Sequence, residues 1–218
     1  MTLKFNDQGL IPALAQDRFD GQIRMVAWMN QEAIEHTLAT GNATFFSRSR
    51  GSLWVKGETS GNLLRVHSMT ADCDADTLLL MVEPAGPSCH TGRASCFFRR
   101  VGPDGSVTDE PFEQTPFFGE LERTIRARQA STSEKSYTRS LLDGGAPKIG
   151  GKIQEEAGEL AAALADEGDD RVLSEAADLL FHVLVGLRAR GLDLRAVAAK
   201  LSARTSQSGH AEKAARGG

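Results

Sequence analysis

The three cysteines of the chain, Cys73, Cys89 and Cys96, lie within one stretch of 24 residues. Residues 72–76 overlap the start of this stretch, and in them three aspartates alternate with other residues. Thiolates are soft ligands that suit zinc, whereas carboxylates suit a hard cation such as magnesium. The segment therefore offers two chemically distinct metal sites, a zinc site on Cys73, Cys89 and Cys96 and a magnesium site on Asp72, Asp74 and Asp76.

Three thiolates leave one position of a tetrahedral zinc open, which is typical of catalytic rather than structural zinc. A water molecule in that position becomes a nucleophile near neutral pH. His90 directly follows Cys89, either as a fourth ligand or as a neighbour that moves protons in a hydrolytic centre. Each cysteine alone would be interpreted as an inert core thiol. Their clustering favours a site.

The aspartates lead into residues 78–82, an apolar run that predicts a buried strand. If the extended geometry begins at Asp72, a period of two places the three aspartates on one face and Cys73 on the other. A calcium-binding EF-hand loop is excluded, because Thr77 stands where that loop requires glycine and an apolar run follows.

Two polar turns near these metal-binding candidates could hold a phosphorylated substrate. Residues 47–51 and 56–62 supply cations, hydroxyl groups and turn backbone N–H groups, the usual means of binding phosphate. Trp54 is interpreted equally well as a ring that stacks on a purine and as a core aromatic. The candidate substrate-binding residues of this half are Arg48, Arg50, Trp54, Lys56, Glu58 and Ser60.

The second half carries an EExxE motif at residues 155–159 and an ExxD motif at residues 175–178. At about 100° per residue, the first group of acids borders the apolar stripe of its helix instead of opposing it. Acids in such positions are costly unless they are paired or bind a cation. Two such helices predict a magnesium cage that grips a polyphosphate and orients an attacking water. The candidate ligands are Glu155, Glu156, Glu159, Glu175 and Asp178, with Glu155 and Glu156 also catalytic, Lys152 substrate-binding and His182 interpreted as structural.

The elements that must position these residues differ between the two halves. Strand-like runs at 44–46, 63–67, 78–82 and 95–101, with one helix at 31–39, predict a mainly-β first half. Helical periodicity at 152–165, 171–189 and 194–204 predicts an all-α second half. The expected fold class is therefore α+β, with a mainly-β zinc domain at 1–112, a linker at 113–118 and an all-α domain at 119–218.

The bulk properties limit the class of function. The net charge of −4 argues against a general nucleic-acid binder, so small-molecule chemistry is expected. No apolar run approaches the roughly 20 residues of a membrane span, and the first residues have no signal-peptide core. A cytoplasmic protein is expected, in which an odd number of cysteines fits metal or catalytic thiols better than disulfides.

Taken together, these residues resemble the bifunctional histidine-biosynthesis family that joins phosphoribosyl-AMP cyclohydrolase to phosphoribosyl-ATP pyrophosphatase. The first half carries the resemblance at 27–30 (AWMN), 47–50 (SRSR), 53–62 (LWVKGETSGN), 72–76 (DCDAD) and 89–97 (CHTGRASCF). The second carries it at 136–138 (SYT), 155–159, 175–182 (EAADLLFH) and 208–213 (SGHAEK). Ala75, where glycine is common, and Phe181, where tyrosine is common, depart from the pattern.

The resemblance implies that the second half cleaves phosphoribosyl-ATP to phosphoribosyl-AMP and pyrophosphate with Mg²⁺. It implies that the first half then opens the adenine ring, by attack of zinc-bound hydroxide at C6 while His90 handles protons. It also implies magnesium on Asp72, Asp74 and Asp76, Zn²⁺ as the second cofactor, and a homodimer whose chains share the zinc ligands. The expected partners are phosphoribosyl nucleotides and a second copy of the chain, with no nucleic acid and no membrane.

Three alternatives were weighed against this interpretation. Zinc nucleoside deaminases also attack a purine at C6, but their H-x-E and P-C-x-x-C signatures are missing from the sequence. A zinc-stapled scaffold without turnover would leave the aspartates and the core-bordering glutamates unexplained. A cyclohydrolase fused to a house-cleaning nucleotide pyrophosphatase would differ in its preference for free nucleotides.

Overall fold

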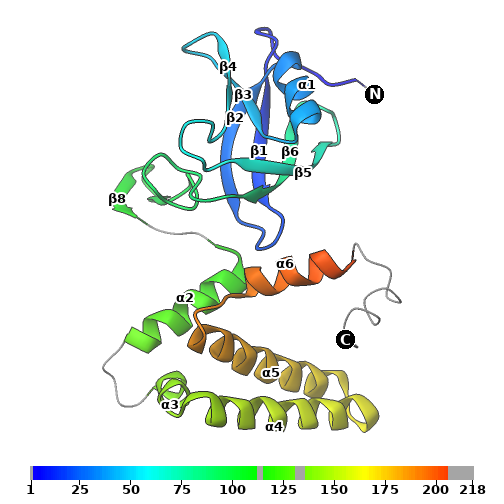
Figure 1. Ribbon diagram of the computed structural model, residues 1–218, viewed down its shortest axis with the longest axis vertical. Coiled ribbons are helices and arrows are strands. Elements are labelled where there is room, and N and C mark those ends of the chain that lie inside the picture. The colour runs from blue at the N-terminus through cyan, green and yellow to red at the C-terminus, as the bar shows by residue number, and fades with distance from the viewer. Residues whose placement is uncertain (1, 112–114, 131–135, 206–218) are drawn as a thin grey trace. The chain divides into compact units, whose positions relative to one another are not determined.

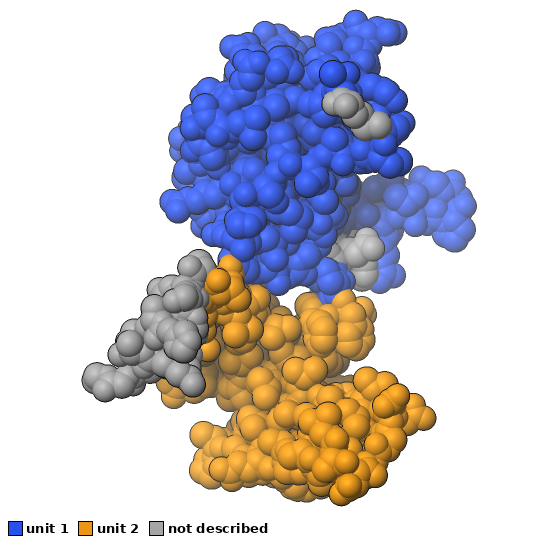
Figure 2. Space-filling model, turned by 90° about the vertical axis from the view of Figure 1, so that its right-hand side faces the viewer, with its two compact units in different colours: residues 1–116 blue, residues 117–218 orange. Residues whose placement is uncertain are grey.

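The computed structural model describes residues 2–111, 115–130 and 136–205. The chain forms two compact units, Met1–Pro116 and Phe117–Gly218 (Figure 2). Helix α2 begins at Phe117, so residues 117 and 118 of the expected linker are helical, and residues 113 and 114 lie outside the described residues.

The first unit is built on a six-stranded sheet with the order β4-β3-β2-β1-β6-β5 (Figure 1). Four of the five neighbouring strand pairs are antiparallel, and β1 pairs with β6 in parallel. The strands are β1 (Ile11–Asp17), β2 (Ile23–Met29), β3 (Thr44–Ser47), β4 (Ser52–Val55), β5 (Leu64–Ala71) and β6 (Leu78–Pro84). One helix, α1 (Gln31–Thr40), is capped by the Asn30 side chain at its start and by Gly41, with a φ of 70°, at its end.

The core of this unit lies on one face of the sheet. Strand β1 alternates strictly, and its inward residues Ile11, Ala13 and Ala15 are fully buried. They pack with inward residues of β6 and with Ala33 and Ile34 of α1 in a single apolar cluster. Positions of the opposite face, such as Pro12 and Leu14, are only partly buried. The strands that carry the polar turns are therefore anchored by this buried apolar cluster.

A separate two-stranded sheet, β7 (Arg99–Val101) and β8 (Val107–Pro111), follows the main sheet in the chain. The strand predicted at 95–101 is thus confirmed only for its last three residues. Residues 95–98 are bound to β2 through Ser95 and Cys96 instead: Ser95 Oγ donates to the Ile23 carbonyl at 2.7 Å, and the Cys96 N–H donates to the Arg24 carbonyl at 2.8 Å.

The second unit is all-α. Its helices are α2 (Phe117–Ala130), α3 (Tyr137–Asp143), α4 (Gly145–Asp166), α5 (Asp169–Ala189) and α6 (Leu194–Thr205). A second apolar cluster, centred on Ile125, Leu141, Ile149, Leu184 and Val185, joins these helices. Together the two units confirm the predicted α+β class, a mainly-β half followed by a helical half. Within the described residues, no helix is both long enough and apolar enough to cross a membrane.

Candidate functional site

Residues 72–76 form a tight turn between β5 and β6. The Asp72 carboxylate accepts the backbone N–H groups of Asp76 at 3.0 Å and Thr77 at 3.1 Å, which is the local bonding by which aspartate stabilises turns. Ala75 has a φ of 63°, and its carbonyl accepts the Lys4 N–H at 2.7 Å. The expectation of an extended strand from Asp72, with the aspartates and Cys73 on opposite faces, is therefore wrong.

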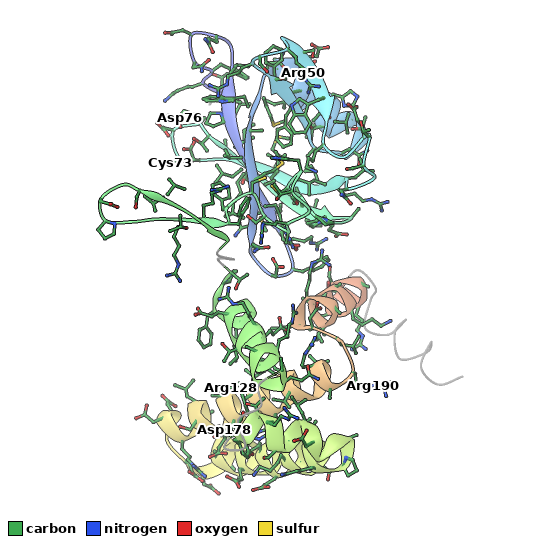
Figure 3. All side chains as sticks on the ribbon, turned by 90° about the vertical axis from the view of Figure 1, so that its left-hand side faces the viewer. Arg50, Cys73, Asp76, Arg128, Asp178 and Arg190 are labelled. Atoms are coloured by element: carbon green, nitrogen blue, oxygen red, sulfur yellow. The ribbon has the colours of Figure 1, made fainter. Side chains whose placement is uncertain are left out.

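The turn nevertheless gathers the three predicted carboxylates. Oxygens of Asp72, Asp74 and Asp76 all lie within 4.8 Å of one another, and all three residues are exposed. Cys73 belongs to the same turn and is exposed as well (Figure 3). Three carboxylate oxygens at this separation fit a hard cation such as Mg²⁺.

The other two cysteines lie together in the loop that follows β6. The loop is closed by the N–H of Cys89, which donates to the Arg93 carbonyl at 3.0 Å, and the Thr91 hydroxyl donates to Cys89 Sγ at 3.1 Å. Burial alone would raise the pKa of Cys89, but its hydrogen bonds, those with Thr91 first and then those with Cys96 and His90, together outweigh burial and lower the pKa. Desolvation, and then the negative charge of Cys89, raise the pKa of the neighbouring Cys96 thiol to about 11.

A single chain thus brings two of the three predicted zinc ligands together. Cys89 and Cys96 interact directly through their side chains. In the part of the chain that the structure describes, Cys73 does not join them, and no thiol belongs to a group of three ligand atoms within 4.8 Å. Two adjacent thiols fit zinc only if further ligands arrive. His90 is exposed, with its Nδ1 3.9 Å from Cys89 Sγ.

Lys56 lies beside this thiol pair. The side chain is buried, with 9% of its surface exposed, and Nζ donates to the Asn62 carbonyl at 3.2 Å. Burial lowers the pKa of Lys56, while the charges of Cys96 and Cys89 oppose that effect. Gly57 makes this turn possible, because its φ is 86° and a Cβ there would lie 2.2 Å from the backbone of Asn62.

A buried ion pair fixes the loop of Cys96 to the sheet. The Arg24 guanidinium contacts Asp17 at 2.5 Å and Asp20 at 3.2 Å, and the Asp17 side chain is completely buried. The same guanidinium donates to the Ala94 carbonyl at 3.3 Å, next to the Cys96 N–H that the Arg24 carbonyl accepts. This ion pair was not predicted from the sequence. Its signal is that Asp17 continues the inward alternation of Ile11, Ala13 and Ala15.

We expect Arg24→Met to destabilise the first unit by about 3–5 kcal/mol, because it leaves the Asp17 carboxylate buried without its cation. Urea denaturation followed by circular dichroism measures the change in the free energy of unfolding. Asp20→Asn is the control in the same network, and its loss should stay near 1 kcal/mol because Asp20 is partly exposed. A loss below about 1 kcal/mol for Arg24→Met would contradict the assignment.

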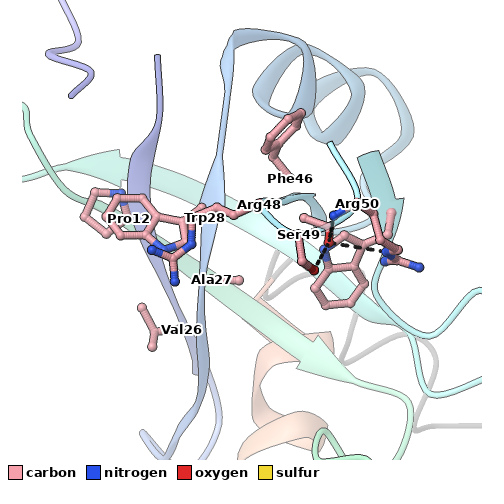
Figure 4. Close-up of a pocket in the computed structure, with 10 residues that line it drawn as sticks. Pro12, Val26, Ala27, Trp28, Phe46, Arg48, Ser49 and Arg50 are labelled. Atoms are coloured by element: carbon pink, nitrogen blue, oxygen red, sulfur yellow. Dashed lines mark hydrogen bonds between the residues drawn. The ribbon is translucent and has the colours of Figure 1, made fainter. Parts of the chain in front are cut away.

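A pocket of about 630 Å³ lies on the sheet at the β3–β4 turn (Figure 4). It is lined by Pro12, Val26, Ala27, Trp28, Phe46 and Trp54 together with residues 47–50. The structure thus brings Arg48, Arg50 and Trp54 of the predicted substrate-binding set together, whereas Lys56, Glu58 and Ser60 lie outside the pocket lining. Its volume is in the range of small-molecule sites.

The second unit has its own carboxylate cluster between α4 and α5. Oxygens of Glu156, Glu175 and Asp178 lie within 4.8 Å of one another. Glu175 is 2% exposed, and its Oε2 is buried with no hydrogen-bond partner among the described atoms. Burial raises the pKa of Glu175, while Arg171 opposes the effect. A buried carboxylate oxygen without a partner is costly, so the cluster fits a hard cation that would satisfy it.

The other acids of the two motifs are paired with cations at the edge of the cluster. Lys152 Nζ contacts Glu155 at 2.8 Å and Glu156 at 3.3 Å, and these hydrogen bonds, that of Glu155 first, raise the pKa of Lys152. Arg171, one helical turn before Glu175, contacts Glu175 at 2.5 Å and Glu159 at 3.3 Å. Arg171 was not predicted, although its i, i+4 spacing to Glu175 was a usable signal.

His182 is 3% exposed and connects two helices to the cluster. Its Nδ1 lies 2.8 Å from the Asp178 carbonyl and its Nε2 lies 2.9 Å from the Tyr137 hydroxyl. Nδ1 is also 3.8 Å from Glu156. These contacts hold the imidazole between α3 and the cluster.

The sheet unit carries a thiol pair and a pocket of small-molecule size, and the helical unit carries a carboxylate cluster, so the chain has two separate candidate sites. Comparison with known families supports both halves. The family model of phosphoribosyl-AMP cyclohydrolase matches residues 25–98. The family model of phosphoribosyl-ATP pyrophosphohydrolase matches residues 118–205.

Curated relatives match nearly the whole chain. The histidine biosynthesis bifunctional protein HisIE of Wolinella succinogenes is 45% identical, over 95% of this chain and 93% of its own length. The proteins of the same name from Synechocystis sp. and Bacillus subtilis are 44% and 43% identical, over 93% and 94% of this chain and 92% and 96% of their own lengths.

The chain belongs to the bifunctional histidine-biosynthesis family that combines phosphoribosyl-AMP cyclohydrolase with phosphoribosyl-ATP pyrophosphohydrolase. It is an enzyme with both hydrolytic activities, as the resemblance in the sequence predicted.

Proposed function

We propose that the two activities are divided between the two halves, with ring opening in residues 1–112, pyrophosphate release in 119–218 and a linker at 113–118, of which residues 117 and 118 already belong to α2. The observation that carries this proposal is the separation of the two donor sets. The thiol pair lies wholly within the first compact unit, and the cluster of Glu156, Glu175 and Asp178 lies wholly within the second.

In the helical half, Glu156, Glu175 and Asp178 would hold Mg²⁺, with Glu155 and Glu159 at the edge of the same site. When bound, the metal neutralises phosphate charge and orients an attacking water. Glu155 and Glu156 are the proposed catalytic acids, because Glu156 belongs to the cluster and Glu155, next to it on α4, contacts the same Lys152 ammonium. Lys152 contacts both of them and would bind a phosphate of phosphoribosyl-ATP.

In the sheet half, Cys73, Cys89 and Cys96 would hold Zn²⁺ in a site shared between two chains of a homodimer. The support is that one chain gathers only Cys89 and Cys96 among its described thiols, while Cys73 is exposed on a separate turn. When bound, zinc lowers the pKa of a water ligand, so that it becomes a nucleophile near pH 7. Asp72, Asp74 and Asp76 would hold Mg²⁺ beside it.

The remaining residues of the sheet half bind and orient phosphoribosyl-AMP. Exposed His90, next to Cys89, would move protons during attack on the adenine ring. Lys56 would offset the negative charge of the thiolates. Arg48, Arg50 and Trp54 line the pocket and would bind the nucleotide, with Glu58 and Ser60 on the neighbouring turn. Three free thiols suit the reducing cytoplasm.

Metal removal and replacement tests this assignment of ions. Chelator-treated protein should lose both activities on phosphoribosyl-ATP. Mg²⁺ alone should restore pyrophosphate release, and Zn²⁺ added with Mg²⁺ should also restore the ultraviolet change of ring opening. Protein-bound metal is measured alongside by elemental analysis. Ring opening that returns with Mg²⁺ alone in zinc-free protein would contradict the zinc site.

A further inference from the structure

The pocket at the β3–β4 turn contains an arginine whose donors are uncommitted. The Arg48 guanidinium lies over the Trp28 ring, 5.1 Å from its centroid (Figure 4). Among the described residues it takes part in no hydrogen bond or ion pair. Stacking on a ring uses the face of a guanidinium and leaves its five N–H groups available in the plane. Arg48 is therefore held in place without being neutralised.

The neighbouring Arg50 differs, because its backbone N–H and its Nε both donate to Ser47 Oγ at 3.3 Å. Ser49 Oγ lies 3.4 Å from the same hydroxyl. The Arg50 side chain is thus held by a hydrogen bond within its own turn, whereas the Arg48 guanidinium has all its N–H groups available for a ligand. The matching chemistry is a phosphate monoester, whose oxygens accept two parallel N–H groups.

Trp54 has a different environment from Trp28. Its ring packs against Phe45, a fully buried core residue, with 5.3 Å between the centroids. Trp54 is therefore fixed to the core as a wall of the pocket, which supports the core-aromatic interpretation of its role. Trp28 lies on β2, between the exposed Val26 and the turn that carries Arg48.

The distance from Trp28 and Arg48 to the thiol pair also suits a nucleotide that would contact both. Strand β2 begins near Arg24, whose carbonyl binds the Cys96 loop, and Trp28 lies four residues further along. Four residues of a strand span about 13 Å, which is comparable with the length of a nucleoside monophosphate. A base at the thiol pair would then place one phosphate at Arg48.

We propose that Trp28 is a positioning residue, which holds the Arg48 guanidinium by cation–π stacking so that it binds one phosphate group of phosphoribosyl-AMP. This inference rests on the proposed ring-opening function of the sheet half. An exposed arginine otherwise samples many rotamers, and losing that freedom on binding weakens affinity. Stacking on Trp28 already restricts the Arg48 side chain before the ligand binds, so less conformational entropy is lost on binding.

Calorimetric titration with AMP, a fragment of the substrate, tests the proposal. Trp28→Leu should weaken AMP binding about threefold to tenfold, the range that a partly exposed cation–π contact supports, and Trp28→Tyr should restore it. Arg48→Gln should weaken binding about tenfold or more. Arg65→Gln removes another exposed arginine outside the pocket lining and should leave AMP affinity unchanged.

The double variant of Trp28→Leu and Arg48→Gln makes the test sharper. If Trp28 acts through Arg48, the double variant binds AMP no more weakly than Arg48→Gln alone. Losses that multiply would overturn the proposal. Adenosine, which lacks the phosphate, should bind the unmodified protein at least about tenfold more weakly than AMP, and equal affinities would also overturn it.

Fluorescence gives an independent readout, because the sequence contains two tryptophans. In Trp54→Phe the emission comes from Trp28, and saturating AMP should change it. Emission that does not respond to AMP, but changes on dilution, would show that a second copy covers the ring and would overturn the proposal.

Kinetics separate this inference from the proposed function. In the ring-opening assay, Trp28→Leu should raise KM and leave kcat within about twofold, whereas a general loss of structure lowers kcat as well. Unchanged KM in an active variant would overturn the inference alone. Absence of ring opening in the unmodified protein with both metals would overturn the proposed function, while the AMP titration would still decide the phosphate site.

Discussion

Cys89→Ala is expected to abolish ring opening and to leave pyrophosphate release intact, whereas Glu156→Gln is expected to do the reverse. Cys89 is a buried thiol of the first unit, and Glu156 is a buried carboxylate of the cluster in the second. Removing even an outer-shell partner of a metal ligand typically costs 10–100-fold in activity. Loss of a ligand should therefore exceed about 100-fold in the affected reaction.

The two reactions are followed separately, with phosphoribosyl-ATP for pyrophosphate release and phosphoribosyl-AMP supplied directly for ring opening. Asp166→Asn is the control for Glu156→Gln, because Asp166 is an exposed acid at the end of the same helix and should change neither rate. One substitution that abolishes both activities in a folded protein would show that the two sites are not independent.

Mixed dimers of two inactive variants are expected to regain ring opening. In a shared zinc site, one chain supplies Cys89 and Cys96 and its partner supplies Cys73. A dimer of one Cys73→Ala chain and one Cys89→Ala chain then contains one complete site and one that lacks both residues. Equal synthesis of the two chains in one cell gives half mixed dimers, so about a quarter of the normal activity should return.

The control for this experiment is a mixture of Cys89→Ala and Cys96→Ala chains. Both residues lie in the loop after β6 of one chain, so no combination of these two variants completes a site, and no activity should return. Recovery in this control, or no recovery in the first mixture, would contradict sharing. Ring opening is measured on purified mixed protein, with the ratio of the two chains determined by mass spectrometry.

Local patterns predicted the helices α1, α4, α5 and α6, and they singled out acids of α4 and α5 that the structure brings together, whereas α2 and α3 were not predicted as separate helices. Helix α1 was expected at 31–39 and spans Gln31–Thr40. Both long helices were predicted from apolar periodicity, and α4 begins earlier than expected, at Gly145. The i, i+3 spacing of Glu175 and Asp178 fixes their relative position within one helix turn. Such a spacing places two side chains on the same face of a helix whatever the rest of the chain does, so it can be recognised from a few residues.

The missed elements depend on contacts distant in sequence. Strand β1 contains Pro12 and two alanines, which favour strands weakly, and it is stabilised by pairing with β2 and β6. The Asp72 turn was predicted as extended because the apolar run after it suggested a longer strand. The pairing of strands within the sheet likewise places Lys56 beside the thiols and Arg24 against Asp17. A short sequence pattern cannot predict that pairing.

The parallel pairing of β1 with β6 has a consequence for the order of folding. It joins Ala13 to Leu78, whereas β1–β2, β3–β4 and β5–β6 can each form from near neighbours. Closing so long a loop costs entropy before any contact repays it, so this step should come late and be slow. The Lys4 bond to Ala75 spans the same gap. The aspartates of residues 72–76 belong to the connection within the locally formed β5–β6 pair, so a metal ion that binds them at the start of refolding should not accelerate this late closure.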